Sequence, residues 1–341
     1  MKARLSLFAL PVWIAACASN QPAPLEPSPT AVAPPPPATP TAEPPPATAA
    51  TSTAATPPAE PPKAAEPPAP KPIVRWGEGL SAPESVLFDE AADRYLVSNV
   101  NGKPLDVDGN GYIAELSPDG KVTKEKFIAG GANKAKLDGP KGLGISKGVL
   151  YVSDISFVRK FDAKTGAPKG EIAIEGATFL NDIAVAPDGR IFVSDSGLKA
   201  KGDSFEPSAT DAVYVIDKTG RPKALARSSE LGGPNGLLFT DKGLLVATYG
   251  SNELYRLDEK GARQQVTKLP NGGLDGIAAS GNTLYVSSWK GSAIYSGEPG
   301  GTFAPAYQGL KGPADISFDA KRKRLLVPRF LDNAVEAYEL K

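Results

Sequence analysis

The feature that most constrains the fold is a pattern that recurs six times between residue 73 and the C-terminus. Each copy opens with a Pro or Leu, a variable residue, and a small or acidic residue, and then continues with alternating apolar positions. The six opening segments are Pro83–Phe88, Pro140–Ile145, Leu180–Val185, Pro234–Phe239, Leu274–Ala279 and Pro313–Phe318. Because one such unit cannot bury its own faces, the six copies must pack against one another.

A second apolar run follows each opening segment after a short turn, as in Leu150–Ser153, and further runs complete most units. Period-two alternation, β-branched and aromatic residues, and turns such as Asp119-Gly120 are strand and hairpin signals. Units of about 40 to 57 residues with four strands each are typical of propeller blades. We therefore expect residues 73–341 to form an all-β, six-bladed propeller with four-stranded antiparallel blades. The last blade has three clear strands, so we expect Ile73–Trp76 to supply its outer strand and join the ends of the ring.

The first sixteen residues are typical of a secretory signal peptide. Lys2 and Arg4 give it a positive start, and the apolar stretch that follows is too short to span a bilayer. It ends in Ile-Ala-Ala before Cys17, the one cysteine of the chain, and this resembles a bacterial lipobox. We expect Cys17 to be lipidated, which makes the protein an exported lipoprotein; the alternative is an ordinary signal peptide with a chance cysteine. Because Ala18 rather than Asp follows, the outer membrane or cell surface is the expected destination.

Residues 17–72 are composed mainly of Pro, Ala, Thr and Glu, and twenty of the 35 prolines lie between Gln21 and Pro72. Such a segment cannot bury enough apolar surface to fold, so we expect a disordered linker. The formal net charge is zero, which gives no reason to expect a nucleic-acid partner. The lipid anchor is the only membrane contact that we expect, and we expect a monomer.

The variable residue of each opening segment precedes the strand that lines the central channel of a propeller. Sixfold repetition therefore directs six side chains toward one ring on one face, and four of them offer oxygen ligands. They are Glu84, Lys141, Asn181, Asn235, Asp275 and Ala314. The sequence contains no histidine, and carboxylate and amide oxygens suit Ca²⁺, or Mg²⁺, rather than Zn²⁺ or copper. The alternative is that these residues serve only to form turns.

Four of these segments resemble the metal-site motifs of the family that comprises senescence marker protein, gluconolactonase and luciferin-regenerating enzyme, with diisopropyl-fluorophosphatase as a distant relative. The motifs are Glu84, Asn181-Asp182, Pro234-Asn235-Gly236 and Leu274-Asp275-Gly276, in this order along the chain. The resemblance implies a six-bladed propeller with an axial divalent metal that hydrolyses lactones or phosphoesters. It also implies that Glu84, Asn235 and Asp275 are metal ligands. Asn181 matches a ligand of the phosphatase branch and a substrate contact of the lactonase branch.

Two positions depart from the family pattern. The lactonase branch has a sugar-binding arginine where this chain has Phe179, which argues against a sugar lactone as substrate. Lys141 places a cation in the ring, where it would weaken metal binding, pair with Glu84 or Asp275, or stabilise a developing oxyanion.

The second strand of each unit should end near the same face, so the residues there are candidates for a substrate pocket. Tyr249, Trp289 and Phe330 come from three consecutive units and could form an aromatic wall, with Arg329 beside them to bind a carboxylate or phosphate. The alternative is that these aromatic residues pack between neighbouring loops. Residues 198–211 are an insertion that would serve as a lid or be a passive loop. Residues 106–111 resemble the start of a calcium loop, but Ser117 occupies its last ligand position, so a hairpin turn is expected.

The sequence therefore predicts a calcium-dependent hydrolase of a lactone, ester or phosphoester, with Asp275 as general base or nucleophile and Lys141 assisting at the oxyanion. The alternative is a propeller on the cell surface that binds a small molecule or a protein without catalysis, since propellers serve many functions.

Overall fold

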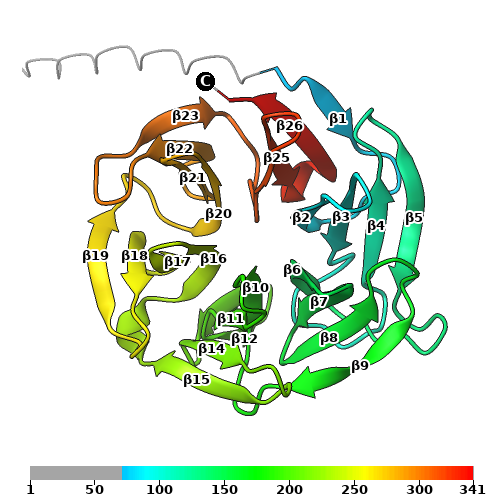
Figure 1. The fold of residues 1–341 in the computed structure, drawn as a ribbon, viewed down its shortest axis with the longest axis horizontal. Coiled ribbons are helices and arrows are strands. Elements are labelled where there is room, and N and C mark those ends of the chain that lie inside the picture. Colours follow the sequence, from blue (N-terminus) through cyan, green and yellow to red (C-terminus); the bar gives the residue numbers. More distant parts are fainter. Residues whose placement is uncertain (1–70, 341) are drawn as a thin grey trace, which may run out of the picture. The chain divides into compact units, whose positions relative to one another are not determined.

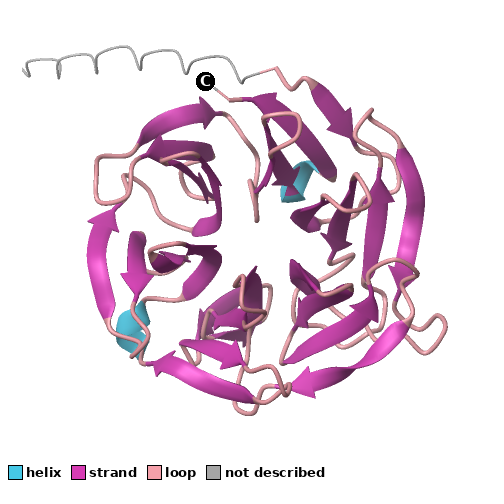
Figure 2. Ribbon diagram, viewed as in Figure 1, coloured by secondary structure: helices cyan, strands magenta, loops and turns pink. Residues whose placement is uncertain are grey.

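The computed structural model describes residues 71–340, so the predicted signal peptide, Cys17 and nearly all of the predicted linker lie outside the described residues. Six four-stranded antiparallel sheets surround a central axis, as the repeat predicts (Figure 1). Strands account for nearly all of the regular structure (Figure 2). The only helical segments within the described part are the 3-10 turns η1 (Ser229–Leu231) and η2 (Phe330–Asp332), so no helix there could cross a membrane.

The blades are numbered in chain order, and each begins with its innermost strand. Blade 1 contains β2 (Pro83–Asp89), β3 (Arg94–Asn99), β4 (Tyr112–Leu116) and β5 (Val122–Ala129). Blade 2 contains β6 (Pro140–Ser146), β7 (Val149–Asp154), β8 (Phe157–Asp162) and β9 (Pro168–Ala173). Blade 3 contains β10 (Leu180–Val185), β11 (Ile191–Asp195), β14 (Ala212–Ile216) and β15 (Pro222–Arg227), and the hairpin of β12 (Leu198–Lys201) and β13 (Ser204–Pro207) is inserted in it.

The remaining blades complete the ring. Blade 4 contains β16 (Pro234–Thr240), β17 (Gly243–Thr248), β18 (Glu253–Leu257) and β19 (Arg263–Lys268). Blade 5 contains β20 (Leu274–Ser280), β21 (Thr283–Ser288), β22 (Ala293–Gly297) and β23 (Ala304–Gln308). Blade 6 contains β24 (Ser317–Asp319), β25 (Arg324–Arg329), β26 (Ala334–Glu339) and, as its outer strand, β1 (Val74–Trp76).

A hydrophobic cluster fills each of the six interfaces between neighbouring blades. Successive side chains of a strand point to opposite faces of its sheet, and each face of a blade meets a different neighbour. Along β3, Tyr95 and Val97 therefore pack toward blade 6, whereas Leu96 packs toward blade 2. This explains why the second run of each repeat is apolar at successive positions rather than at alternate ones.

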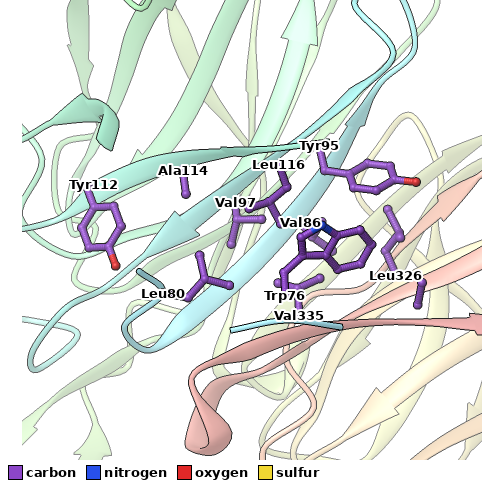
Figure 3. Packing of buried hydrophobic residues seen from close by; sticks show 11 residues of the cluster. Trp76, Leu80, Val86, Tyr95, Val97, Tyr112, Ala114, Leu116, Leu326 and Val335 are labelled. Carbon is purple, nitrogen blue, oxygen red and sulfur yellow. The ribbon is translucent and has the colours of Figure 1, made fainter. Parts of the chain in front are cut away.

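The ring closes between blades 6 and 1, where the two ends of the described chain meet. Strand β1 pairs with β26, with Val74 opposite Ala337 and Trp76 opposite Val335, so the predicted role of the N-terminal strand is confirmed. Trp76 is 1% exposed and packs edge-on against Tyr95 with the ring centroids 5.5 Å apart (Figure 3). Pairing the outer edge of blade 6 in this way ties the two ends of the ring to each other.

The inner strand of blade 6 is shorter than the repeat predicts. A strand over Pro313–Phe318 was expected, but β24 begins at Ser317. Asp315 instead pairs in parallel with Ser85 of blade 1, and its backbone N–H donates to the carbonyl oxygen of Glu84 at 2.9 Å. The start of this segment therefore contributes to the junction between the first and last blades.

Candidate functional site

A β-bulge lies at the variable residue of the first five repeats. In blades 1 to 5 the register between the first two strands shifts between the opening Pro or Leu and the apolar residue three positions later. In blade 1, Pro83 pairs with Asn99 but Val86 pairs with Val97, so Glu84 lies within the bulge. Bulges re-aim side chains and are common beside functional sites. Five of the six predicted ring residues line one pocket, whereas Ala314 is fully buried and does not.

Serines at the end of the second strand hold these bulges in place. Ser194 Oγ accepts the backbone N–H of Asp182 in its own blade at 2.9 Å and donates to the carbonyl oxygen of Asn235 in the next blade at 2.6 Å. Ser287 likewise accepts from Gly276 and donates to Ala314. Their role was not predicted, although serine recurs as the last residue of the second run in four of the six repeats.

Small residues follow the ring residues because neighbouring inner strands approach closely there. A Cβ atom built on Gly236 would lie 1.8 Å from the carbonyl oxygen of Asp275, and one on Gly142 would lie 2.5 Å from the Cα of Asp182. No larger side chain fits without moving the adjacent ligand-bearing backbone. The small residue in the repeat is therefore a packing requirement of the site.

The four predicted ligands each bring one buried, unpaired oxygen to the pocket. Glu84, Asn181, Asn235 and Asp275 are 2–6% exposed. Seven buried side-chain polar atoms in residues 71–340 have no hydrogen-bond partner, and four of these are Glu84 Oε2, Asn181 Oδ1, Asn235 Oδ1 and Asp275 Oδ1. Buried polar atoms normally have partners. A hard divalent cation would satisfy four such oxygens together, so the donor set fits Ca²⁺ or Mg²⁺.

Only two of these four donors are carboxylates. Accordingly, the described part of the chain contains no cluster of three or more His, Cys, Asp or Glu side chains arranged as a metal site. A cation at this position would depend on the amide oxygens of Asn181 and Asn235 as much as on the two carboxylates.

The electrostatics of the ring reflect the concentration of buried carboxyl groups. Burial, followed by the charge of Asp275, raises the pKa of Glu84 well above its ordinary value, while Lys141 opposes this shift. Burial also raises the pKa of Asp275 to about 7, although the hydrogen bond from Trp289 works in the opposite direction. A nearby cation would favour the ionised form of both groups.

Two side chains outside the ligand set orient the ligands. Trp289 Nε1 donates to Asp275 Oδ2 at 2.6 Å, which leaves Oδ1 as the unpaired oxygen. Asn181 Nδ2 donates to Ser196 Oγ at 3.2 Å, and Ser196 Oγ donates to the carbonyl oxygen of Pro234 at 2.8 Å. Such outer contacts fix ligand orientation.

Lys141 makes neither of the ion pairs considered from the sequence. Its ammonium donates to the carbonyl oxygens of Pro104 at 3.0 Å and Gly139 at 2.9 Å, and lies 4.6 Å from the ring centroid of Phe179. Among the described residues no carboxylate is within ion-pair distance of it. Burial lowers the pKa of Lys141, and the charge of Glu84 opposes this. A lysine ammonium has three donors, so one N–H remains for a ligand.

The pocket has a volume of about 410 Å³ and an aromatic wall. Tyr249, Trp289 and Phe330 all line it, and the Trp289 and Phe330 ring centroids are 5.3 Å apart. Arg329 does not line it, which corrects the expectation that this side chain would meet a bound anion. Successive strand residues point to opposite sides, and Arg329 points away from the pocket to form ion pairs with Glu336 and Asp332.

The inserted hairpin of blade 3 borders the same pocket. Phe205 of β13 lines the pocket and packs edge-on against Phe179 with centroids 5.4 Å apart. Asp203 at the hairpin tip forms an ion pair with Lys103 of the β3–β4 loop at 2.8 Å. The insertion is therefore part of the pocket wall, and the ion pair connects it to blade 1. The calcium-loop-like residues 106–111 belong to this β3–β4 loop.

A second ring, one position further along the opening segments, contains Ser85, Asp182 and Asp315, which line another cavity of about 740 Å³. Its two carboxyl groups are both bonded: Asp182 accepts the backbone N–H of Leu237 at 2.6 Å, and Asp315 accepts the hydroxyl of Ser85 at 2.5 Å. Unlike the four ring oxygens above, these groups have partners within the protein.

Comparison with solved structures finds other propellers. A gluconolactonase from Xanthomonas campestris is 20% identical, with 78% of this chain and 88% of its own covered, at a TM-score of 0.59. The virginiamycin B lyase of Staphylococcus aureus is 14% identical, with 78% and 98% covered, at 0.54. A chain of a nidogen–laminin complex is 16% identical, with 64% and 76% covered, at 0.51. No family model and no curated protein sequence matches the chain.

At these identities the likeness establishes the fold alone. It confirms the propeller that the sequence resemblance implied, and a gluconolactonase stands among the structural neighbours. The neighbours also include a lyase and a component of a protein complex, so the same fold accompanies different functions.

Proposed function

We propose that this propeller is a hydrolase that depends on a hard divalent cation, Ca²⁺ or Mg²⁺, and acts on a lactone, ester or phosphoester. The observation that supports it most directly is the set of four buried, unpaired oxygens on residues that four different blades contribute to the lining of one pocket. The similarity to a gluconolactonase agrees with lactonase-type chemistry. Because the sequence contains no histidine, no histidine-dependent triad is available.

Each side chain has a distinct role in this proposal. Glu84, Asn181, Asn235 and Asp275 would hold the cation, which when bound supplies Lewis-acid polarisation of a carbonyl or phosphoryl oxygen. Asp275 would accept a proton from the attacking water or act as the nucleophile itself. Lys141 would donate its remaining N–H to the developing oxyanion.

A propeller that binds a ligand without catalysis is the second candidate. The ring favours it at two positions, since Lys141 and Ala314 offer no oxygen ligand, and Phe179 stands where the lactonase branch has a sugar-binding arginine. One of the structural neighbours is itself a component of a protein complex.

Turnover measurements separate the two candidates. The full-length chain is incubated with lactones, aryl esters and phosphotriesters, in calcium or magnesium and after chelation, and cation binding is measured by calorimetry. We expect turnover that is lost on chelation and in Asp275→Ala, and retained in Val266→Ala, whose side chain is exposed on the outer strand β19. Cation binding without turnover of any compound favours the binding propeller. Failure to bind either cation contradicts the metal site itself.

We also propose that the chain is exported and anchored through a lipid on Cys17, that it is a monomer at the outer membrane or cell surface, and that the lipid is its only membrane contact. The lipobox-like sequence before Cys17 supports this proposal. Cys17→Ser should abolish incorporation of a labelled fatty acid and release the protein from membranes. Retention of the variant in the membrane fraction would contradict the anchor.

A further inference from the structure

The walls of the pocket are apolar on two opposite sides. Phe179 and Phe205 form an edge-on pair contributed by blade 3, and Trp289 and Phe330 form a tilted pair contributed by blades 5 and 6. Blades 3 and 6 face each other across the ring (Figure 1). Leu198 of the hairpin also lines the pocket. A ligand in this pocket therefore lies between two apolar walls, next to the buried polar groups of the ring.

The cationic side chains that line the pocket all have partners in the protein. Lys141 binds two backbone carbonyl oxygens and the face of Phe179. Lys103 forms an ion pair with Asp203. Arg329 lies outside the pocket, paired with carboxylates of its own blade. Among the residues described, the pocket therefore offers no arginine for a carboxylate or for the hydroxyl groups of a sugar acid.

Three exposed apolar side chains lie in or beside the segments that line the pocket, although Lys103, Asp106 and Asp203 line it too. The described residues include five large apolar side chains that are exposed to solvent, and three of these lie at the pocket or next to a lining residue. Phe205 lines the pocket at 43% exposure, Val107 follows the lining residue Asp106 at 79%, and Leu331 follows Phe330 at 63%. Of these three, Phe205 adds exposed apolar surface to the pocket itself.

We propose that the pocket takes an uncharged substrate with a substantial hydrocarbon part, such as a lactone or ester that carries an alkyl chain or aryl group, rather than a polyhydroxylated sugar lactone. This inference rests on the proposed hydrolase function. The carbonyl oxygen lies at the polar ring, and the hydrocarbon lies between the Phe179–Phe205 and Trp289–Phe330 pairs. Sugar hydroxyls placed against these walls would lose their water partners without replacement, whereas each buried methylene strengthens binding about fourfold.

A matched ligand series tests this directly and does not require turnover. The full-length chain is titrated in calcium, by calorimetry, with lactams of one ring size that carry alkyl chains from ethyl to octyl, because lactams resist hydrolysis. A polyhydroxylated sugar lactam serves as the comparison. We expect affinity to rise about fourfold per methylene until the hydrocarbon part of the pocket is filled, and the sugar lactam to bind more weakly than the longer alkyl lactams. Hydrolysis of the corresponding lactones is measured in parallel.

Two variants locate the effect. Phe205→Ala should reduce the gain in affinity per methylene. Leu331→Ser, next in sequence to the lining residue Phe330, should also reduce it, and because its side chain is exposed this variant should fold normally. Val266→Ala, on the remote outer strand β19, should leave the gain unchanged. Far-ultraviolet circular dichroism checks that each variant is folded.

The outcomes separate this inference from the proposed function. An affinity that does not change with chain length, or tighter binding of the sugar lactam, overturns the inference even if lactones are hydrolysed. An affinity that rises with chain length while no lactone or ester is turned over overturns the hydrolase and leaves the ligand class standing.

Discussion

Replacing Asp275 by Asn keeps the size of a proposed ligand and removes its charge. Asp275 is 4% exposed, with Trp289 bonded to Oδ2 and no partner on Oδ1. In calcium-free protein, burial raises its pKa from 3.8 to about 7. The folded state therefore holds this proton more tightly than the unfolded state does. The stability that the group contributes is fully present below its unfolded pKa and is lost as the pH rises through about 7.

The magnitude follows from the same values. A pKa raised from 3.8 to about 7 corresponds to about 4 kcal/mol of folding free energy, which is lost progressively as the pH rises from about 4 to about 7. At about pH 8 without calcium, we expect Asp275→Asn to be more stable than the unmodified chain by about 2 to 4 kcal/mol, and the difference to vanish at about pH 4. Calcium at about a thousand times its dissociation constant should stabilise the unmodified chain by about 4 kcal/mol, and the variant by far less.

The assay is urea unfolding at both pH values, in chelator and in calcium. Asp319→Asn provides a matched control, since this buried carboxyl lies where blade 6 meets blade 1 and accepts the hydroxyl of Tyr95. Although burial raises the pKa of Asp319, hydrogen bonds from Tyr95 and Arg322 hold it below its ordinary value. Asp319→Asn should therefore be less stable than the unmodified chain at pH values above the unfolded pKa of Asp319, by the same amount with and without calcium. If calcium-free Asp275→Asn is less stable than the unmodified chain at about pH 8, and its calcium response is unchanged, the four oxygens do not form a cation site.

Three further substitutions test the parts that position the site. Trp289→Phe removes the donor to Asp275, so calcium affinity measured by calorimetry should fall about tenfold or more, as expected for a hydrogen bond to a charged group; unchanged affinity would contradict the positioning role. Gly236→Ala places a Cβ 1.8 Å from a backbone oxygen and should abolish calcium binding, whereas Gly77→Ala, with its nearest atom at 3.8 Å, should not. Trp76→Ala should lower the free energy of unfolding in urea by about 3 to 5 kcal/mol, because it leaves a cavity in the hydrophobic cluster between blades 6 and 1. A loss below about 1 kcal/mol would show that the closure of the ring does not depend on this side chain.

The fold was predictable because the length of the repeat indicates a four-stranded blade and the number of copies indicates a six-bladed ring. Four strands per unit, six units and a missing outer strand in the last one follow from the order of apolar runs. The structure confirms the pairing of β1 with β26 that this order implies. Only in blade 6 did the opening segment differ, since Asp315 pairs with Ser85 across the junction with blade 1. That pairing depends on the closed ring, which no single repeat encodes.

The sequence predicted which positions of the repeat contribute to the site, but not which way every side chain points. Sixfold repetition predicted a shared pocket for six ring residues, and five of them line it. The bulge that aims their side chains depends on strand register, which is set by pairing rather than by composition. Arg329 and Phe330 illustrate the limit, since they are adjacent in sequence but only Phe330 lines the pocket. Arg329 ends strand β25 and Phe330 begins the 3-10 turn η2, and the sequence does not show where the strand gives way to the turn.

Lys141 illustrates how a departure from the repeat acquires a role through its neighbours. The repeat places Lys141 in the same ring as Glu84, where its charge would compete with a cation. In the structure, the Lys141 ammonium donates to the carbonyl oxygens of Pro104 and Gly139 and lies over the ring of Phe179. Pro104 belongs to the β3–β4 loop, which also carries Lys103, the partner of the blade 3 hairpin. Lys141 therefore links the ring to the loops that border the pocket. Because its charge is buried within the ring and close enough to Glu84 to affect its pKa, it lowers the attraction of the site for a cation. In the proposed hydrolase the third N–H of the ammonium would support the oxyanion, so one side chain would both weaken the hold on the cation and stabilise the developing charge.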